Sequence, residues 1–395
     1  MRIGVLGGGQ LARMMALQGA DLGFEVHVLS EEPTDPAAQI VKNWHKGSID
    51  DTFALQNFFS QCEVVTIESE FLNSQKLQAK LSSDQIEKLR PSLNCISTLQ
   101  DRASQKTFLK DNKIATAEFV ISPDEAELHS FLKTHKKGFV AKKRTHGYDG
   151  YGTFIIRSQK ELNQFVRDQS QNSNFASQNF IIEKLISFRR ELAISVFRDR
   201  FGHLLWTPLV EWKARDKKCW WVCGPVEHKG LAQIKKQIKK ALAEIEYIGA
   251  MSFEFFEDQD RTLIVNEVAP RVHNSAHYSL NALSLDQFQA HLFCASGESL
   301  KSVALAKGSL APICRSFAMV NLIGKVNQPV SNEKLAAVRP RIAGHGFLHW
   351  YGKTEERQGR KMGHINVCGL GTPAQSLRVA LSLEKEFFRD AKRGF

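Results

Sequence analysis

The apolar and polar positions at the start of the chain alternate first with the period of a strand and then with that of a helix. A strand is predicted over Arg2–Leu6, a glycine turn over Gly7–Gly9, a helix over Gln10–Leu22 and a second strand over Glu25–Leu29. The glycines let the backbone approach a ligand, and the N-terminus of the helix presents free N–H groups to an anion. This order predicts a strand–helix–strand unit of an open α/β sheet.

A further apolar strand, Cys62–Ile67, ends in two acidic residues, Glu68 and Glu70. The carboxyl ends of strands form the edge at which open α/β sheets place their ligands. The first domain is predicted to cover residues 1–97, and a helix beginning at Thr98 is predicted to open the second.

Short strands and helices alternate through residues 98–300, which form the predicted second domain. The predicted strands are Phe119–Ser122, Gly138–Lys142, Phe154–Ile156, Phe180–Glu183 and Leu192–Phe197, and the predicted helices include Asp124–Thr134 and Leu285–Ala295. Residues 301–395 turn toward strands and turns, which predicts a small β-rich third domain.

Two carboxylates lie in apolar, strand-like runs late in the second domain. Glu254 stands between two phenylalanines, and Asn266 and Glu267 close the run Leu263–Val265. A hairpin that turns over Glu257–Arg261 brings the two acids side by side. Like charges held between apolar neighbours repel each other unless a cation lies between them. Mg²⁺, which prefers oxygen ligands and keeps waters and substrate phosphates, suits such a pair.

Donors suited to a small anionic substrate follow the hairpin directly. They are Arg271, His273, Asn274 and His277. The alternative is an ordinary hairpin whose glutamates face solvent, and this cluster of donors favours a metal and anion site instead.

Composition is that of an ordinary globular protein, with 395 residues, 43% hydrophobic and 24% charged. The apolar run at the start is too short for a signal sequence, and no stretch of about 18 apolar residues could span a bilayer. A cytoplasmic protein with no membrane partner is expected. Seven scattered cysteines without a C-x-x-C pair suggest neither a disulfide framework nor a zinc site.

A net charge of +11 raises the question of nucleic-acid binding. The lysines between residues 235 and 240, however, lie opposite an apolar helical stripe that includes Ile234, Ile238 and Leu242. A solvated helix face explains them better than a nucleic-acid partner. A positive field would also attract phosphorylated small substrates. The net charge alone therefore does not distinguish such a substrate from a nucleic acid.

A glycine-rich loop follows Lys142, with Gly147, Gly150 and Gly152 among cationic residues. Its backbone N–H groups can fold over a polyphosphate while Lys142 supplies a fixed charge. The loop lacks the G-K-[ST] of a Walker motif, and a simple glycine-rich hairpin turn is an equal alternative.

Taken together, these motifs resemble the ATP-grasp ligases and, within them, the N5-carboxyaminoimidazole ribonucleotide synthases. The matching segments include Gly7–Met14, Gln100–Arg102, Lys142–Gly152, Ile182–Glu183, Asn266–Glu267, Arg271–Ser275 and Gly359–His364. The resemblance implies an ATP-grasp fold with an N-terminal Rossmann-like pre-ATP-grasp domain and a small C-terminal β-rich domain.

The implied reaction belongs to purine biosynthesis and uses ATP and Mg²⁺ as cofactors. ATP phosphorylates bicarbonate, carboxyphosphate releases CO₂ in a closed site, and the exocyclic amine of aminoimidazole ribonucleotide captures it. The family also implies a homodimer.

The resemblance assigns roles residue by residue. It implies that Arg102 and Lys142 contact the ATP phosphates. The lid over the phosphates is implied to be Gly147, Tyr148, Asp149, Gly150 and Gly152. The adenine hinge is Glu183, Lys184, Leu185 and Ile186, the ribose contact is Glu191, and the Mg²⁺ ligands are Glu254 and Glu267 with Asn266 adjacent. Arg271, His273 and Asn274 are implied to bind bicarbonate and to take part in carboxyl transfer. The residues implied to bind the nucleotide substrate are Gly8, Gly9, Gln10, Glu68 and Tyr148. Those implied to bind its 5′-phosphate are Lys353, Arg360 and Lys361.

The chain also departs from the family pattern. It has Trp212-Lys213-Ala214 where the family has Asn-x-His, so the histidine that contacts ATP is missing. His146, Tyr151 and Thr153 replace a glycine, a basic residue and a glutamine of the loop, and Phe71–Asn73 replaces Asn-Val-Pro.

Three alternatives remain beside the carboxylase. The first is a paralogue with another acceptor, such as a formate-dependent glycinamide ribonucleotide transformylase, which the change at Ala214 motivates. The second is a nicotinamide oxidoreductase, which Gly7-x-Gly9-x-x-Ala12 and Glu31 would fit. The third is a non-catalytic nucleotide-binding or RNA-binding descendant.

Overall fold

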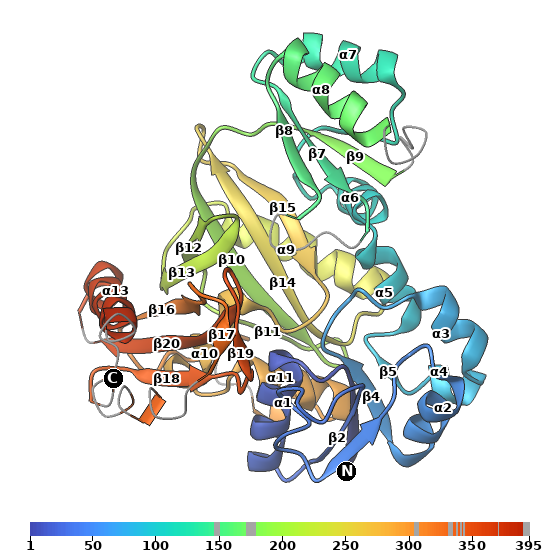
Figure 1. Cartoon of the computed structure of the whole chain (residues 1–395), viewed down its shortest axis with the longest axis vertical. Coiled ribbons are helices and arrows are strands. Elements are labelled where there is room, and N and C mark those ends of the chain that lie inside the picture. Colours follow the sequence, from blue (N-terminus) through green and yellow to red (C-terminus); the bar gives the residue numbers. More distant parts are fainter. Residues whose placement is uncertain are drawn as a thin grey trace.

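The computed structural model describes residues 1–145, 151–170, 179–303, 308–330, 335–336, 339, 342, 344–369 and 371–389. The chain forms a lower body and a smaller upper lobe, and the N-terminus lies in the lower body (Figure 1).

The first region is a parallel five-stranded sheet in the order β3-β2-β1-β4-β5. Its elements are β1 (Arg2–Leu6), α1 (Gln10–Asp21), β2 (Glu25–Ser30), β3 (Asn43–Lys46), α2 (Thr52–Gln61), β4 (Val64–Ile67), α3 (Ser74–Lys80), α4 (Ser83–Ile86) and β5 (Leu89–Arg90). The strand, glycine turn and helix predicted at the start are confirmed. The edge strand β3 was not predicted, because its sequence Asn-Trp-His-Lys has no apolar alternation.

Two helices, α5 (Leu93–Gln100) and α6 (Arg102–Asp111), lead into the second region. The sequence predicted a helix beginning at Thr98, but the chain breaks at Asp101, whose backbone is extended (φ −93°, ψ 122°). Its carboxylate accepts hydrogen bonds from the N–H groups of Ala103 and Ser104 and so caps α6. The new helix therefore begins at Arg102.

The upper lobe is an antiparallel four-stranded sheet in the order β6-β9-β7-β8, covered by two helices (Figure 1). Its elements are β6 (Phe119–Ile121), α7 (Glu125–Thr134), β7 (Phe139–Lys143), β8 (Thr153–Ile156), α8 (Gln159–Ser170) and β9 (Phe180–Lys184). Phe131, Phe139, Phe165 and Phe180 fill the space between the helices and the sheet.

A nine-stranded sheet forms the centre of the molecule, with β11 paired to β10 beside the main order β15-β14-β10-β12-β13-β16-β20-β18. Its strands are β10 (Phe188–Arg198), β11 (Leu204–Trp206), β12 (Val210–Arg215), β13 (Lys218–Gly224), β14 (Gly249–Asp258), β15 (Leu263–Ala269), β16 (Ser316–Ile323), β18 (Phe347–Trp350) and β20 (Lys361–Gly369). The helical elements of this part are α9 (Leu231–Glu244), the 3₁₀ turn η2 (Asn274–Ala276), α10 (Ser279–Ala282), α11 (Gln287–Ser296) and the 3₁₀ turn η3 (Leu300–Ser302). As the apolar stripe predicted, α9 buries Ile234, Ile238 and Leu242.

The C-terminal region is rich in strands, as predicted, but its long strands do not form a sheet of their own. Strand β16 pairs with β13, so the central sheet continues into this region and β13 is not left as an open edge. A small ribbon of β17 (Gln328–Pro329) and β19 (Glu355–Glu356) lies apart. Helix α13 (Pro373–Arg389) covers the sheet with Ala380, Leu383 and Phe387.

One apolar core joins the three regions. It includes Met14 and Val28 of the first region, Phe197 and Tyr278 of the second, and Phe317 of the third. Close packing across these regions resists relative displacement, so residues far apart in sequence are held at one place. None of the helices in the described residues is long and apolar enough to cross a membrane.

Two histidines at the contacts between regions, the buried His291 and the partly buried His349, make folding stability depend on pH. His291 accepts from the Ala250 N–H at Nδ1 (3.0 Å) and contacts Thr66 Oγ1 through Nε2 (2.8 Å), and His349 Nε2 contacts Asn281 Oδ1 (2.7 Å). Burial lowers the pKa of each of these imidazoles to about 4. The unfolded chain, with an ordinary histidine pKa of 6.5, then binds more protons than the folded chain at mildly acidic pH.

We therefore expect the free energy of unfolding to fall as pH drops from 6.5 toward 4, by about 3 kcal/mol for His291 alone. Urea unfolding at a series of pH values checks this. His291→Gln should flatten the profile, whereas His345→Gln, which changes an exposed side chain, should leave its shape unaltered. A wild-type profile that stays level between pH 7 and 5 would contradict the expectation.

Candidate active site

The predicted hairpin is present, and its two acids face each other. Strands β14 and β15 pair antiparallel with Glu254 opposite Glu267, and a β-bulge separates this pair from the next one, Phe255 and Val265. The bulge leaves Asn266 as the extra residue. Asn266 and Glu267 are both partly exposed, between the buried Val265 and Val268. A regular strand would send neighbouring side chains to opposite faces, so the bulge lets the amide and the carboxylate both reach the cations described next.

Each acid has a cationic or ionisable neighbour. Arg102 Nη2 donates to Glu267 Oε1 at 3.2 Å, and His273 Nδ1 lies 3.8 Å from Glu254 Oε1. The described residues contain no group of three or more histidine, cysteine, aspartate or glutamate side chains that could hold a metal ion. Two opposed carboxylates beside an amide nevertheless fit Mg²⁺, because this ion uses few protein ligands and completes its shell with water and phosphate oxygens.

Lys142, at the end of β7, connects the upper lobe to the hairpin. Its Nζ donates to Asn266 Oδ1 at 3.0 Å and pairs with Glu183 Oε1 at 3.0 Å. Glu183 is buried, and burial alone would raise the pKa of its carboxyl. Lys106 and Lys142 outweigh burial and hold that pKa below its ordinary value. Lys142 therefore brings a positive charge to the amide next to Glu267.

The predicted adenine hinge lies at the end of β9. The side chain of Glu183 faces the two lysines, while the backbone N–H of Lys184 donates to Glu118 O (2.8 Å) and that of Leu185 to Gly138 O (3.2 Å). Ile186 follows in the loop toward β10. The predicted ribose contact, Glu191, is paired with Trp212 in the sheet, and burial raises the pKa of its carboxyl to about 7.

Arg271 is held by a carboxylate from the first region. Its Nε donates to Glu70 Oε2, and its Nη2 donates to Glu70 Oε1 at 3.1 Å. Burial acts to lower the pKa of the guanidinium, but Glu70 overrides burial and raises it. A two-point contact of this kind fixes the plane of the guanidinium beside Glu68 and Glu267, which both act on its charge.

His273 and Asn274 follow Arg271 at the start of η2. Burial, and then Arg271 and Lys361, lower the pKa of His273 far below its ordinary value, so this imidazole is neutral at pH 7. The amides of Asn274 and Asn321 exchange two hydrogen bonds (3.1 and 2.7 Å). Because Asn321 lies on β16, this amide pair ties the motif to the C-terminal region.

Glu68 occupies the helix N-terminus that the glycine turn creates. Its oxygens accept from the N–H groups of Gly9 (2.9 Å) and Ala12 (3.0 Å), and α1 has no other side-chain cap. A dinucleotide-binding fold would use these donors for a pyrophosphate. The nicotinamide hypothesis is therefore not supported, since the chain's own carboxylate fills the anion position. Of the other predicted residues here, Gly8 accepts from the Ala37 N–H through its carbonyl and Gln10 begins α1.

The predicted phosphate-binding residues of the C-terminal region lie around the start of β20. Lys353 is buried and donates to Lys361 O (2.6 Å), and Arg360 donates to Glu355 O (3.3 Å). Lys361 lies near enough to His273 to lower its pKa. Contact with the first region is direct, because Gln39 Nε2 donates to Gly352 O at 2.8 Å.

Three domain models match this chain in the order of its three regions. The ribonucleotide synthetase preATP-grasp domain matches residues 1–100, the ATP-grasp domain matches residues 107–288, and the phosphoribosylaminoimidazole carboxylase C-terminal domain matches residues 318–374.

Named relatives agree over nearly the whole chain. The chain is 31% identical over 366 residues to the N5-carboxyaminoimidazole ribonucleotide synthase of Staphylococcus aureus strain MRSA252, with 92% of each chain covered. It is 34% identical to that of Synechococcus elongatus, with 92% of this chain and 89% of the relative covered. The chain belongs to the N5-carboxyaminoimidazole ribonucleotide synthase family.

Solved structures of this family superimpose along the full length. The S. aureus N5-carboxyaminoimidazole synthetase complexed with ADP gives a TM-score of 0.84 at 28% identity, covering 97% of this chain and 96% of that one. The Aspergillus clavatus enzyme in complex with ADP and 5-aminoimidazole ribonucleotide gives a TM-score of 0.82 at 26% identity, with 98% of each chain covered. The predicted ATP-grasp fold is thereby confirmed, and the chain is an ATP-grasp carboxylate–amine ligase.

Several predicted site residues of this synthase family member lie outside the described part of the chain. They are the lid residues Gly147, Tyr148, Asp149 and Gly150. Gly152 is described, and its φ of +72° is a left-handed value that favours glycine. Tyr151, one of the departures from the family pattern, places its ring 5.6 Å from Lys143 Nζ.

The sequence did not single out two residues that the structure brings to the site, namely Lys106 and Asn321. It placed Glu70 at the ligand edge of the first sheet but not beside Arg271. Lys106 could have been found, because Ala103 and Leu109, one helical turn away on either side, are both buried. A lysine on an apolar helix face needs buried partners. Asn321 carries no comparable local signal, and nothing in the sequence around Glu70 indicates that Arg271 is its partner.

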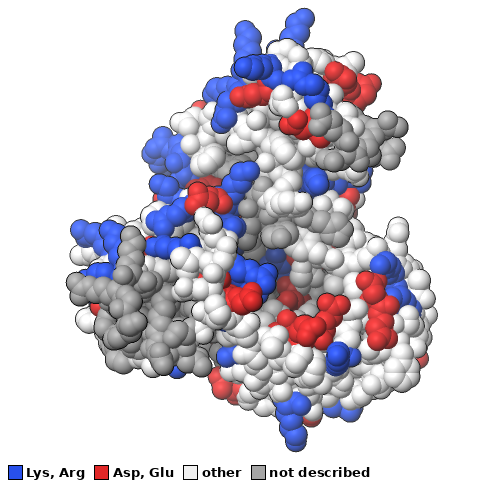
Figure 2. Space-filling model, viewed as in Figure 1, with Lys and Arg blue, Asp and Glu red and all other residues white. Residues whose placement is uncertain are grey.

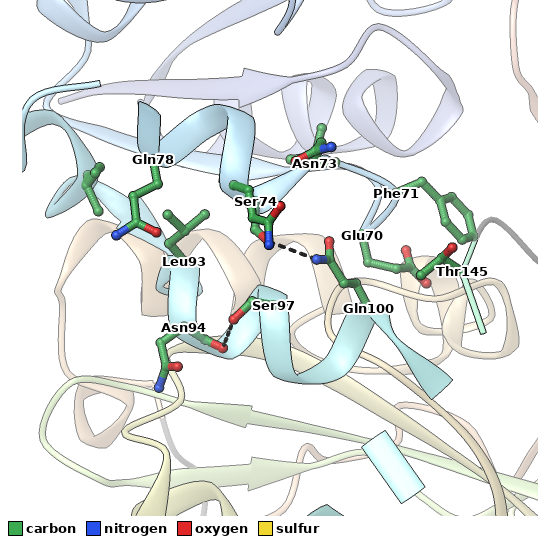
Figure 3. A pocket seen from close by; sticks show the side chains of 13 residues that line it. Glu70, Phe71, Asn73, Ser74, Gln78, Leu93, Asn94, Ser97, Gln100 and Thr145 are labelled. Atoms are coloured by element: carbon green, nitrogen blue, oxygen red, sulfur yellow. Dashed lines mark hydrogen bonds between the residues drawn. The ribbon is translucent and has the colours of Figure 1, made fainter. Parts of the chain in front are cut away.

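A groove of about 760 Å³, between α3 and α5, has Glu70 in its lining. Figure 3 shows Glu70, Phe71 and Thr145 at one end and Gln78, Leu93 and Asn94 at the other. Gln100 contacts Ser74 Oγ at 2.9 Å. With its amide oriented to satisfy both groups, it also donates to the carbonyl oxygens of Leu72 and Glu70. Gln100 thus holds the loop that carries Glu70.

Figure 2 shows basic side chains interspersed with acidic ones on the displayed face, without a continuous basic stripe. This distribution does not favour the RNA-binding alternative on that face.

Proposed function

We propose that this protein uses ATP and bicarbonate to carboxylate 5-aminoimidazole ribonucleotide to its N5-carboxyamino product in purine biosynthesis. The observation that carries the proposal is the arrangement around the hairpin. Glu254 and Glu267 lie opposite each other. Arg102 donates to Glu267, Lys142 donates to the adjacent Asn266, and His273 of the Arg271 motif lies 3.8 Å from Glu254. Family membership over the whole chain supports the same reaction.

Arg102 and Lys142 would hold the phosphates of ATP, and Lys142 also orients Asn266 through its hydrogen bond. Glu254 and Glu267 would hold Mg²⁺, whose positive charge offsets the negative charge that develops as phosphate is transferred. Arg271 would hold the bicarbonate, because two of its five N–H groups remain after the contacts to Glu70 and to Val272 O among the described residues. The neutral His273 is suited to accept or donate a hydrogen bond rather than to act as a cation.

The ribonucleotide would lie between the first and third regions, where Gln39 meets Gly352 and where Lys353, Arg360 and Lys361 gather. Enclosure by three regions suits a reaction with a carboxyphosphate intermediate, because water would hydrolyse it. The cytoplasmic location and the homodimer implied by the resemblance stay predictions.

A coupled ADP-release assay tests the proposal. We expect ADP formation that requires Mg²⁺, bicarbonate and aminoimidazole ribonucleotide together. Formate with glycinamide ribonucleotide should give only the background rate. ADP formation that depends on formate and glycinamide ribonucleotide would instead support the paralogue hypothesis, which the Trp212-Lys213-Ala214 departure motivates.

A further inference from the structure

Lys106 is a cation deep inside the molecule, behind the lysine assigned to phosphate. It lies on α6 one turn after Arg102, and only 2% of its side chain is exposed. An isolated ammonium group at such a position would be strongly disfavoured, so its partners decide what it does.

Those partners satisfy the whole ammonium group. Its Nζ lies 3.1 Å from Glu183 Oε2 and donates to Thr116 Oγ1 at 2.6 Å and to Val265 O at 3.2 Å. An ammonium group has three N–H donors, and each has an acceptor here. Burial lowers the pKa of Lys106 to about 8, which leaves it a cation at pH 7.

Glu183 is shared between two lysines. Its second oxygen lies 3.0 Å from Lys142 Nζ, and only 4% of its side chain is exposed. The group therefore holds two positive charges and one negative charge. Lys142 is at the more open end, with 13% of its side chain exposed.

We propose that Lys106 is a positioning residue, which keeps Glu183 neutralised so that the charge of Lys142 remains available to a phosphate of ATP. The inference rests on the proposed use of ATP. Without Lys106, Lys142 and Glu183 form a neutral pair, and drawing Lys142 toward a phosphate leaves a buried carboxylate without a partner. Removing one partner of a buried charge is strongly unfavourable, so the pair would resist phosphate binding.

Three variants and a matched control test this by affinity for ATP and for adenosine, measured by calorimetry. Lys106→Met should weaken ATP binding tenfold or more while adenosine affinity changes less than threefold, because adenosine carries no phosphate. Because Glu183 also belongs to the predicted adenine hinge, its variants are judged by the ratio of ATP affinity to adenosine affinity, in which a loss of adenine contacts cancels. In Glu183→Gln this ratio should be at least that of the wild type. The double variant Lys106→Met/Glu183→Gln should return the ratio to within about threefold of the wild type, since no carboxylate then pairs with Lys142. Lys110→Met, an exposed change one turn further along α6, should have no effect.

Two results would overturn the proposal. One is an equal loss of ATP affinity in Lys106→Met and in the double variant, which would indicate a packing role. The other is a tenfold loss in Glu183→Gln of the ratio of ATP affinity to adenosine affinity, and this variant decides the question even if Lys106→Met does not fold. Binding does not depend on the acceptor, so a protein that binds ATP but fails to carboxylate aminoimidazole ribonucleotide refutes the proposed function alone. A wild-type protein that does not bind ATP refutes both.

Discussion

Glu267→Gln is expected to lower turnover by about a hundredfold to a thousandfold, the range seen when one preorganised electrostatic contact is removed from a reacting centre. Glu267 lies opposite Glu254 and accepts a hydrogen bond from Arg102, so the amide weakens both the cation site and the orientation of the guanidinium. Because half of the carboxylate pair is lost, the Mg²⁺ concentration needed for half-maximal rate should also rise. Steady-state ADP release across a Mg²⁺ titration measures both effects.

Glu244→Gln is the matched control for this experiment. It makes the same change on the exposed face of α9 and should leave turnover and Mg²⁺ dependence unaltered. Stability should barely change in Glu267→Gln, because its side chain is 43% exposed. A variant with wild-type turnover at low Mg²⁺ would remove Glu267 from the metal site.

Arg271→Ala is expected to abolish carboxylation while ATP affinity stays within about threefold of the wild type. The guanidinium is fixed by Glu70, and the residues assigned to phosphate, Lys142 and Arg102, make their contacts elsewhere. Lost orientation of one reactant lowers the rate of capture rather than the binding of the other. Product formation from labelled bicarbonate, measured beside ATP affinity, separates the two effects.

This substitution also leaves Glu70 buried without its partner, at a cost of about 3–5 kcal/mol in the free energy of unfolding. The double variant Arg271→Ala/Glu70→Gln should recover most of that stability and still fail to carboxylate. Arg2→Ala, which removes an exposed guanidinium 3.7 Å from Glu63, should change neither property. Carboxylation by the refolded double variant would show that Arg271 serves stability and not the reaction.

Positions of the buried charges explain why these two substitutions differ in stability. Glu267 is partly exposed, so water can take the place of the hydrogen bond that Arg102 loses when Glu267 is substituted. Arg271 and Glu70 are 16% and 9% exposed and depend on each other for solvation. Lys142 and Lys106 differ in exposure in the same way, because 13% of the Lys142 side chain is exposed and only 2% of the Lys106 side chain.

Elements with a local signal could be predicted from the amino-acid sequence. Alternation of apolar and polar residues was enough for β1, α1 and the β14–β15 hairpin, because strand and helix periods appear within a few residues. It also brought Glu254 and Glu267 together correctly, since a short turn sets the register of a hairpin. The resemblance of ordered motifs carried the family assignment, which the comparisons confirm.

The partners of the charged side chains could not be predicted and are known from the folded structure. Glu70 and Arg271 are 201 residues apart, and Lys106 on α6 meets Glu183 on β9 of the upper lobe. No local period marks such pairs. Glu68 became the cap of α1, and β16 joined β13, because a helix N-terminus and an open strand edge each need hydrogen-bond partners wherever the fold can supply them.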